Sequence, residues 1–194
     1  MTEIAQFPEL SLYDYSPYDE RPKIVWPNGA RLAFWVAPNI EFYELNPPIN
    51  PHRQPWPHPY PAVPGYSIRD YGNRVGHQRQ MALLDKYGVR GSISLSAALC
   101  EHHPEIIALC AERNWEFFSH GIYNTRYTYG LTEDQEREMI EDAMETIERA
   151  VGQRPAGYLA PALSHSNHTI DLFAEAGGWY TCDLFHDDQP TWVN

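Results

Sequence analysis

Short apolar runs alternate with amphipathic stretches along most of the chain. The runs have the length and the aromatic or β-branched content of buried strands, and they cover residues 31–37, 89–95, 115–119, 157–160 and 179–183. Between them, apolar residues recur at helical spacing over about 74–87, 104–113, 132–151 and 169–176. No hairpin signal joins two of the runs. The alternation predicts an α/β fold with parallel strands and right-handed crossovers, open or rolled into a barrel.

The ends of the predicted helices have residue types that favour helix termini. Gly88, Asn114 and Gly152 each follow a helical stretch, where a left-handed residue commonly ends a helix. Thr132 and Gln135 have the spacing of a capping box at the start of the longest helix. These signals fix the ends of three predicted helices.

Two segments fall outside this pattern. Residues 1–30 are rich in Pro, Tyr and Asp and lack periodicity, so we expect an N-terminal arm that lies over the domain or a neighbouring subunit. Residues 46–65 hold eight prolines, which excludes a helix or a central strand. We expect a long loop there that acts as a lid or a subunit contact. Residues 31–194 would then form one catalytic domain.

Composition limits which partners the protein can bind and in which cellular compartment it is expected. The 194 residues are 43% apolar, and 14 basic against 26 acidic side chains give a net charge of −12. This charge repels phosphate backbones, so we expect no nucleic-acid partner. The apolar runs are far shorter than the roughly 20 residues of a membrane span, and the N-terminus lacks the pattern of a secretion signal. The widely spaced Cys100, Cys110 and Cys182 fit reduced thiols, and we expect a cytoplasmic protein without membrane partners.

Polar side chains follow four of the predicted strands. The carboxyl ends of parallel strands meet at one edge of a sheet, and ligands bind beyond that edge. In chain order the residues are Glu41; His120 and Asn124; Pro161 with His165 and His168 beyond it; and Asp183 with His186, Asp187 and Asp188 beyond it. Four strands followed by polar residues at the same edge of the sheet predict a single site. Arg74 either reaches this site to hold an anionic group or stays at the surface.

Each of these residues also has a purely structural interpretation. Glu41 could be an exposed loop acid, and His120 a buried structural imidazole. Asn124 could cap a turn, and Asp187 with Asp188 could form one.

Four stretches resemble motifs of the polysaccharide deacetylase, or NodB-like, superfamily. They are WPNGARLAF with the following Asn-Ile-Glu, SHGIYN, GYLAPAL and TCDLFHDDQP, and the last is the most specific. The resemblance runs from about residue 31 to the end and is closest to the branch of metal-independent allantoinases and cyclic imide hydrolases. It implies a distorted (β/α) barrel that hydrolyses non-peptide carbon–nitrogen bonds. The chain ends soon after the fourth motif, so we expect either a fragment or a barrel completed by a partner copy in a homo-oligomer.

The metal-dependent members of this superfamily bind a divalent ion through one Asp and two His, beside an Asp that acts as the base. Matched motif by motif, the base corresponds to Glu41 and the metal-binding Asp to Phe42. The two histidines correspond to His120 and Asn124, and an arginine of the third motif to Leu159. A phenyl ring cannot bind a metal, and an amide oxygen is a poor zinc ligand. The resemblance with these departures implies a site without a metal cofactor.

The remaining groups suit hydrolysis without a metal. Glu41 would accept a proton from water, while the imidazole of His120 donates to the developing oxyanion or to the leaving nitrogen. Asp183 or Asp187 would orient that imidazole. A small cyclic ureide or imide suits this chemistry because its ring carbonyl is more electrophilic than that of an acetamide. The predicted catalytic residues are Glu41, His120 and Asp183, and the predicted substrate-binding residues are Asn124, Arg74, Pro161, Asp187 and Asp188.

Two other interpretations remain open. The replacements at Phe42, Asn124 and Leu159 also fit a catalytically silent binding or assembly module. Alternatively, the chain is a metal-dependent deacetylase of an amino sugar, with a zinc or similar ion held by His120 and a second histidine. The histidines available for such a rebuilt site are His165, His168 and His186.

Overall fold

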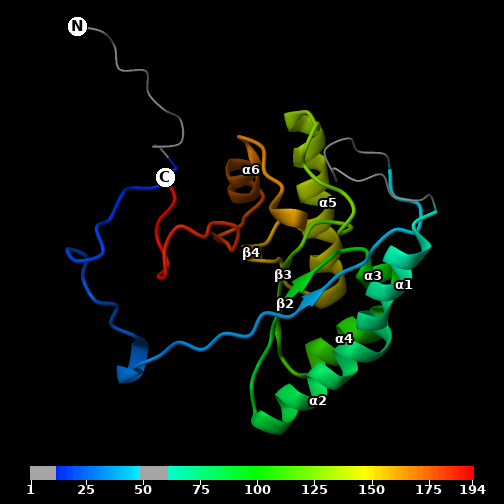
Figure 1. Ribbon diagram of the computed structural model, residues 1–194, viewed down its shortest axis with the longest axis horizontal. Helices are drawn as coiled ribbons and strands as arrows, with labels where there is room; N and C mark the ends of the chain where they lie inside the picture. The colour runs from blue at the N-terminus through cyan, green and yellow to red at the C-terminus, as the bar shows by residue number, and fades with distance from the viewer. Residues whose placement is uncertain (1–11, 49–60) are drawn as a thin grey trace, which may run out of the picture. The chain divides into compact units, whose positions relative to one another are not determined.

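The strands form one parallel sheet whose order in space follows the order along the chain (Figure 1). A computed structural model describes residues 12–48 and 61–194. The strands are β1 (Asn39–Ile40), β2 (Ser92–Leu95), β3 (Glu116–Ser119), β4 (Gly157–Tyr158) and β5 (Tyr180–Thr181), each parallel to the next. This confirms the predicted α/β class. The sequential order is that of a barrel wall, and the sheet of the described residues ends at β1 and β5 without closing.

Helices fill the connections between the strands. Before β2 come α1 (Val63–Tyr71), a π-helical turn (Gly72–Gly76) and α2 (His77–Tyr87). Before β3 come α3 (Leu99–His102) and α4 (Pro104–Glu112), and before β4 comes α5 (Glu133–Val151). Before β5 come a 3₁₀ turn (Pro161–Leu163) and α6 (Thr169–Glu175). Within the described ranges, no helix combines the length and the apolarity that a bilayer crossing requires.

The helices pack on one face of the sheet. Ile93 and Leu95 of β2 and Phe117 of β3 belong to a core cluster with residues of α2, α4 and α5, among them Met81, Leu84, Ile106, Ile107, Cys110, Ala143 and Ile147. A second cluster joins α5 and α6 to β4 and contains Ile140, Met144, Tyr158, Leu172 and Phe173. These contacts bury the apolar stripes that the sequence pattern predicted.

The opposite face of the sheet carries a different set of side chains. Because side chains alternate along a strand, Ser94 and Ser96 point away from the helices. On β3, Phe118 does the same, and its ring lies 5.8 Å from that of Trp35 and 6.1 Å from that of Tyr180. This face therefore combines an aromatic row with small hydroxyl side chains.

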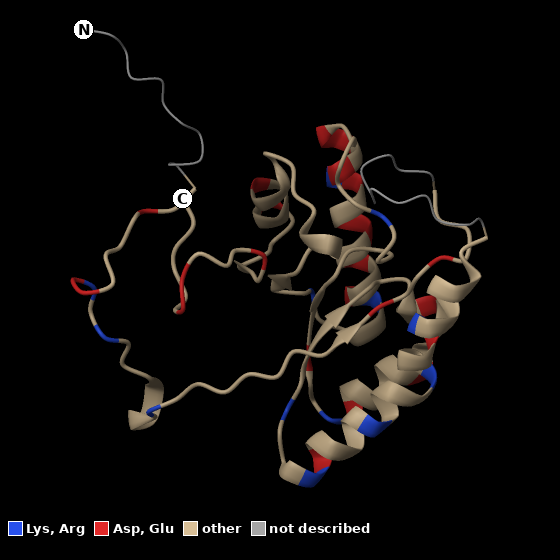
Figure 2. Cartoon of the chain, in the orientation of Figure 1, with Lys and Arg blue, Asp and Glu red and all other residues tan. Residues whose placement is uncertain are grey.

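The longest helix, α5, begins and ends as predicted. The Thr132 hydroxyl accepts from the Gln135 N–H while the Gln135 side chain accepts from the Thr132 N–H, which is a complete capping box. Gly152 ends the helix in the left-handed conformation with φ of 76°. Figure 2 shows acidic residues recurring along α5. Acids in the first turn stabilise the positive end of the helix dipole.

The first strand lies later in the chain than predicted. We expected a buried strand at residues 31–37, but only Val36 is bridged to the sheet, through Gly91. Leu32 and Phe34 are both 74% exposed. The reason is a missing partner. The residues before Gly91 turn back into the end of α2. Among the described residues, the run before Val36 therefore has no strand to pair with.

The helical segment before β2 begins earlier than predicted. α1 starts at Val63, inside the segment 46–65 where we expected only loop, and Pro64 occupies its first turn, where a missing N–H is tolerated. The expected start near residue 74 falls instead inside the π-helical turn. Residues 49–60 of the proline-rich segment lie outside the described residues, so its role as a lid or subunit contact stays a prediction.

The chain divides into two compact units. Trp35–Asp183 forms the unit with the sheet and the helices. Leu184–Asn194 forms the other with the residues up to Phe34, and there Tyr13 stacks on His186 with ring centroids 3.7 Å apart. The position of the predicted arm over a neighbouring subunit stays a prediction.

All three cysteines are free thiols. Cys110 is buried, and burial raises the pKa of its thiol to about 12. Cys100 and Cys182 are half-buried, and burial raises the pKa of each to about 11. All three are therefore protonated at neutral pH.

Candidate active site

The register of the sheet places Glu41, Ser96 and His120 side by side at the carboxyl ends of β1, β2 and β3. The last registered residues of these strands are paired with one another, so the next residue of each strand occupies adjacent positions. Two strand spacings separate Glu41 from His120 at the backbone, or about 10 Å. The small side chain of Ser96 lies between them and lets the two longer side chains meet. His120 Nε2 lies 3.4 Å from Glu41 Oε1.

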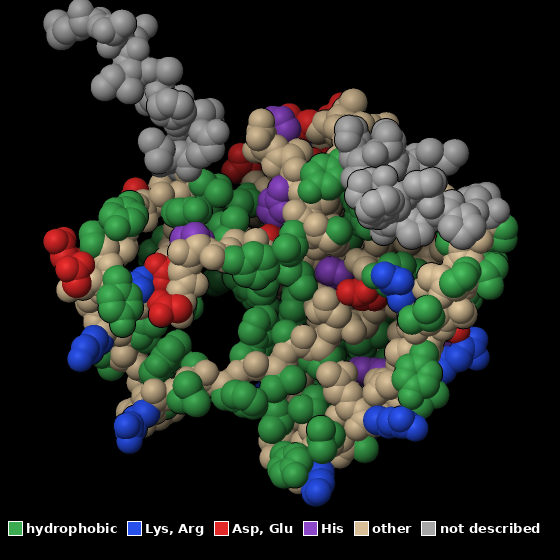
Figure 3. All heavy atoms as spheres, viewed as in Figure 1, with side chains coloured by type: hydrophobic (Ala, Val, Ile, Leu, Met, Phe, Trp, Pro, Cys, Tyr) green, Lys and Arg blue, Asp and Glu red, His purple; other side chains and the backbone are tan. Residues whose placement is uncertain are grey.

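Asn124 bonds to both of these side chains. Its Nδ2 donates to Glu41 Oε2 at 2.7 Å, and its Oδ1 accepts from His120 Nε2 at 2.9 Å. The backbone N–H of Asn124 donates to the carbonyl of Phe42 at 3.0 Å, which fixes the loop after β3 to the loop after β1. We call Glu41, His120 and Asn124 the polar cluster. Just right of the centre of Figure 3, histidine, acidic and basic side chains lie next to one another on the viewed face.

Both ring nitrogens of His120 face hydrogen-bond acceptors. Nδ1 lies 2.6 Å from the carbonyl oxygen of Leu159, which can only accept. Nε2 faces Asn124 Oδ1, because the amide nitrogen of Asn124 is directed at the Glu41 carboxylate. The ring is therefore held between two acceptors and lies against the Glu41 carboxylate.

Glu41 is the member of the polar cluster that solvent reaches. Its side chain is 25% exposed, against 4% for His120. Partial burial alone would raise the pKa of the Glu41 carboxyl, but the hydrogen bond and the charge of His120 outweigh it, with further help from Asn39 and Tyr43. The pKa of Glu41 therefore lies below its ordinary value, and the group is an anionic acceptor at neutral pH.

A single peptide group links the polar cluster to Asp183. The Leu159 carbonyl accepts from His120, and the N–H of the same peptide, on Ala160, donates to Asp183 Oδ1 at 2.8 Å. Asp183 Oδ2 accepts from His165 Nε2 at 2.7 Å. The sequence predicted that Asp183 or Asp187 orients the imidazole of His120. The structure gives Asp183 a direct contact with His165 and only an indirect link to His120.

Pro161 lies against the turn that follows His120. Gly121 has φ of +64°, and a Cβ atom there would lie 2.9 Å from Pro161 Cγ. Glycine is therefore required at residue 121 for both its backbone angle and this close approach. Pro161 thus shapes the wall beside His120, whereas substrate contact by its ring stays a prediction.

The loop that contains His165 is held in place by hydrogen bonds to a buried acid, Glu136, which the sequence analysis missed. Glu136 is 1% exposed, and its carboxylate accepts from the hydroxyls of Ser166 and Thr169. No pattern distinguished Glu136 from the other acids in the first turn of α5. Only the tertiary fold turns it inward.

Tyr43 and Arg69 extend the site and were also missed. Asn124 Nδ2 donates to the Tyr43 hydroxyl as well as to Glu41. Burial raises the pKa of Tyr43, Arg69 opposes that rise and Glu41 adds to it. The guanidinium carbon of Arg69, on α1, lies 4.2 Å from the centroid of the Tyr43 ring. The position of Tyr43 two residues after Glu41 was the only signal that the sequence offered.

Three predicted substrate-binding residues have partners outside the polar cluster. Arg74 binds Asp70 one turn earlier, and its side chain is otherwise exposed. The structure thus places Arg69, not Arg74, beside the cluster. Asp187 and Asp188 both bind Arg21 within the unit formed by the chain ends. Roles in substrate binding for Arg74, Asp187 and Asp188 stay predictions.

The residues of the polar cluster do not suit a divalent ion. Nε2 of His120, the nitrogen free for a metal once Nδ1 has donated to a carbonyl, is hydrogen-bonded to Asn124 instead. The ring of Phe42 stacks on His102 at 4.2 Å and offers no donor. The donor set is thus one carboxylate, one engaged imidazole and one amide, which is poor for zinc.

The histidines proposed for a rebuilt metal site have other partners. His165 donates to Asp183, His168 Nδ1 lies 3.7 Å from Glu133, and His186 bonds to Thr191. Across residues 12–48 and 61–194, no group of three or more His, Cys, Asp and Glu side chains is arranged to hold a metal ion.

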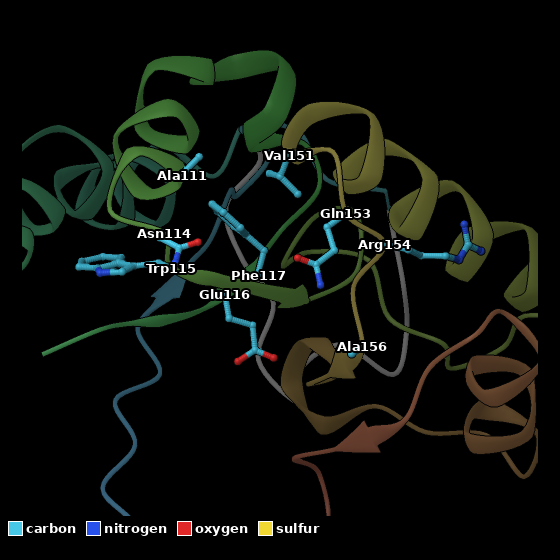
Figure 4. A pocket seen from close by; sticks show the side chains of 9 residues that line it. All are labelled: Ala111, Asn114, Trp115, Glu116, Phe117, Val151, Gln153, Arg154 and Ala156. Carbon is cyan, nitrogen blue, oxygen red and sulfur yellow. The ribbon is translucent and has the colours of Figure 1, made fainter.

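A cavity of about 130 Å³ lies at the other end of the sheet (Figure 4). It is lined by Ala111, Asn114, Trp115, Glu116, Phe117, Val151, Gln153, Arg154 and Ala156, which surround the amino ends of β3 and β4. Ligands of parallel α/β sheets bind at the carboxyl ends. The polar cluster, not this cavity, is therefore the candidate active site.

The family model for polysaccharide deacetylases matches residues 67–180. The match contains His120 and Asn124 but begins after Glu41 and ends before Asp183. A peptidoglycan deacetylase of Helicobacter pylori is 27% identical over 118 residues, which are 61% of this chain and 40% of that protein.

Two solved structures are similar over longer stretches. The PuuE allantoinase covers 92% of this chain, with a TM-score of 0.73 and 25% identity, and this chain covers 64% of it. A probable polysaccharide deacetylase of Pseudomonas aeruginosa covers 67%, with a TM-score of 0.61 and 30% identity, and this chain covers 43% of it. The chain therefore spans less than two thirds of each of these proteins.

Proposed function

Because the chain belongs to the polysaccharide deacetylase family, we propose that it hydrolyses the carbon–nitrogen bond of a small cyclic ureide or imide without a metal ion. The observation that carries the proposal is the polar cluster, in which Asn124 bonds to both Glu41 and His120; by the motif resemblance, His120 and Asn124 correspond to the two metal-binding histidines of the family's metal-dependent members. The similarity to the PuuE allantoinase, over 92% of the chain, supports this substrate class above a polysaccharide.

Glu41 activates the water. It is the exposed member of the polar cluster, and its carboxylate already accepts from Asn124 and from Asn39, at 3.2 Å. A water on its free lone pairs gives one proton to the carboxylate as its oxygen attacks the substrate carbonyl. A carboxylate is suited to this step because the water is hydrogen-bonded to it, so the proton passes directly from the water to the carboxylate oxygen.

His120 stabilises the charge that the attack creates. A substrate carbonyl that takes the place of Asn124 Oδ1 meets the Nε2–H donor of His120 in a buried site, where such a contact is stronger than in water. The protonated Glu41 then returns its proton to the ring nitrogen as the carbon–nitrogen bond breaks. The products are a carboxylic acid, which gives its proton to solvent, and a carboxamide or urea N–H, and both residues recover their starting protonation.

Two other functions predict different experimental results. A deacetylase of an amino sugar would release acetate and depend on a metal, as the similarity to peptidoglycan deacetylases would suggest. A binding module with a silent site would retain ligands without turnover, which the replacements at Phe42 and Asn124 would also permit. A silent binding module gives no catalytic role to the contact between His120 and the Glu41 carboxylate.

Turnover of allantoin and succinimide by the wild-type protein and by Glu41→Gln tests the proposal. We expect measurable hydrolysis that falls at least about 100-fold in Glu41→Gln. The matched control is Glu44→Gln, because Glu44 is a nearby glutamate engaged with Arg126 and Thr125; its turnover should stay near the wild-type value. Equal loss in both variants, or acetate release from N-acetylglucosamine oligomers instead, would contradict the proposal.

A further inference from the structure

Arg69 lies next to the polar cluster through Tyr43. Its guanidinium stacks on the face of the Tyr43 ring at 4.2 Å, and the hydroxyl of the same ring accepts from Asn124. Tyr43 thus contacts the cluster with its hydroxyl and holds Arg69 with its ring face. The guanidinium also hydrogen-bonds to the Tyr43 side chain, and a cation stacked on a ring keeps its other N–H groups, at the rim of the guanidinium plane, available for hydrogen bonds.

Arg69 differs from the neighbouring arginines in its charge balance. Arg74 binds the Asp70 carboxylate, and Arg126 donates to Glu44 Oε1 at 2.8 Å. Within residues 12–48 and 61–194, Arg69 has no carboxylate partner. The positive charge of Arg69 therefore lies next to Tyr43 and the polar cluster without a carboxylate of the described residues to balance it.

We propose that Arg69 binds an anionic group of the substrate, and that the substrate is a cyclic ureide or imide that carries a carboxylate. The inference rests on the proposed function for the reacting ring and adds the charged substituent. A guanidinium offers two parallel N–H donors that match the two oxygens of a carboxylate, whereas a neutral substituent leaves them to water. Binding this substituent at Arg69 would direct the ring carbonyl of the same molecule toward Glu41.

A substrate pair in which a carboxylate is replaced by its uncharged methyl ester measures this preference. The probes are hydantoin-5-acetic acid, which is anionic at pH 7, and its methyl ester. In the wild-type protein we expect a higher kcat/KM for the acid. In Arg69→Gln the ratio of acid to ester should fall by about tenfold or more, through KM rather than kcat, and Arg69→Lys should retain part of it.

Arg79→Gln is the matched control. Arg79 is also an exposed arginine with a tyrosine as its partner, since it donates to the Tyr71 hydroxyl at 3.1 Å, but no described contact joins it to the polar cluster. Its ratio of acid to ester should equal that of the wild type. Equal kcat/KM values for acid and ester in the wild type, or an unchanged ratio in Arg69→Gln, would overturn the inference and leave the proposed function standing.

A binding measurement separates the two proposals. The thermal shift that hydantoin-5-acetic acid produces in wild-type protein should be larger than in Arg69→Gln, whether or not turnover occurs. An Arg69-dependent shift without hydrolysis would retain the anion site and contradict the proposed function. Neither hydrolysis nor an Arg69-dependent shift would contradict both.

Discussion

His120 and Asp183 are bonded to opposite sides of one peptide group. The carbonyl of that group, on Leu159, accepts from His120, and its N–H, on Ala160, donates to Asp183. Asp183 is almost fully buried, with a side chain 1% exposed, and is itself held by His165. Asp183 therefore positions the imidazole of His120 indirectly, by fixing the backbone carbonyl to which that imidazole is hydrogen-bonded.

Asp183→Ala should lower turnover by up to about 100-fold, because the Leu159 carbonyl loses its fixed position and His120 is displaced from the reacting geometry. The unpaired Ala160 N–H should also cost about 1–3 kcal/mol of unfolding free energy. In Asp183→Asn, the amide oxygen still accepts from Ala160, so kcat should recover in part. Steady-state kinetics and urea unfolding of both variants check this. Equal kcat in the Ala and Asn variants would show that the bond to Ala160 is not what matters.

Ser96 should tolerate loss of its hydroxyl but not a larger side chain. Its Oγ is fully buried and has no hydrogen-bond partner among the described residues, so Ser96→Ala should keep turnover and leave the melting temperature unchanged or higher. Ser96→Val places methyl groups between Glu41 and His120 and should abolish most turnover, at a cost of about 1–3 kcal/mol in stability. Full activity in a folded Ser96→Val protein would contradict the contact of these side chains across β2.

The lowered pKa of Glu41 predicts the direction of a pH effect on stability. A carboxyl whose pKa is depressed in the folded state stabilises that state above its unfolded pKa, ordinarily 4.5, and loses this contribution as pH falls through the folded pKa. The stability difference between wild type and Glu41→Gln should therefore favour the wild type most near pH 7. Urea unfolding at several pH values between 7 and 3 measures it. A difference that grows in favour of the wild type on acidification would mean that the folded pKa is raised.

The three thiols should resist alkylation in the folded protein. Burial raises their pKa values to about 11 for Cys100 and Cys182 and about 12 for Cys110, so little thiolate exists at pH 8. Iodoacetamide at pH 8, followed by mass measurement, should leave the native chain largely unmodified and label three sites in urea. Rapid modification of Cys182 in the native state would contradict its burial.

The sequence predicted most of the fold where local signals and tertiary contacts agree. The left-handed ends at Gly88 and Gly152 and the capping box at Thr132 are confirmed, because each depends on a conformation of one or two residues. The strand expected at residues 31–37 was wrong, because the presence of a partner strand is not encoded in the apolar run itself. The motifs placed the chain in its family, which the family match confirms.

The site was predicted unevenly for the same reason. Glu41, His120 and Asn124 directly follow strands or lie one turn beyond them, so the topology alone brings them together. Arg69 reaches the cluster from α1, whose early start the sequence did not indicate. Glu136 acquires its partners, Ser166 and Thr169, only through the packing of α5 against the start of α6 and the loop before it. Residues whose function depends on such packing carry no signal in one sequence.

The most direct test of metal-free catalysis is the rate of hydrolysis of a cyclic ureide or imide before and after exhaustive removal of divalent ions with a chelator. If Glu41 and His120 carry the reaction, kcat should remain unchanged within error in chelated protein, and added Zn²⁺ should not raise it. A loss of turnover on chelation that zinc, manganese or cobalt restores would contradict the account.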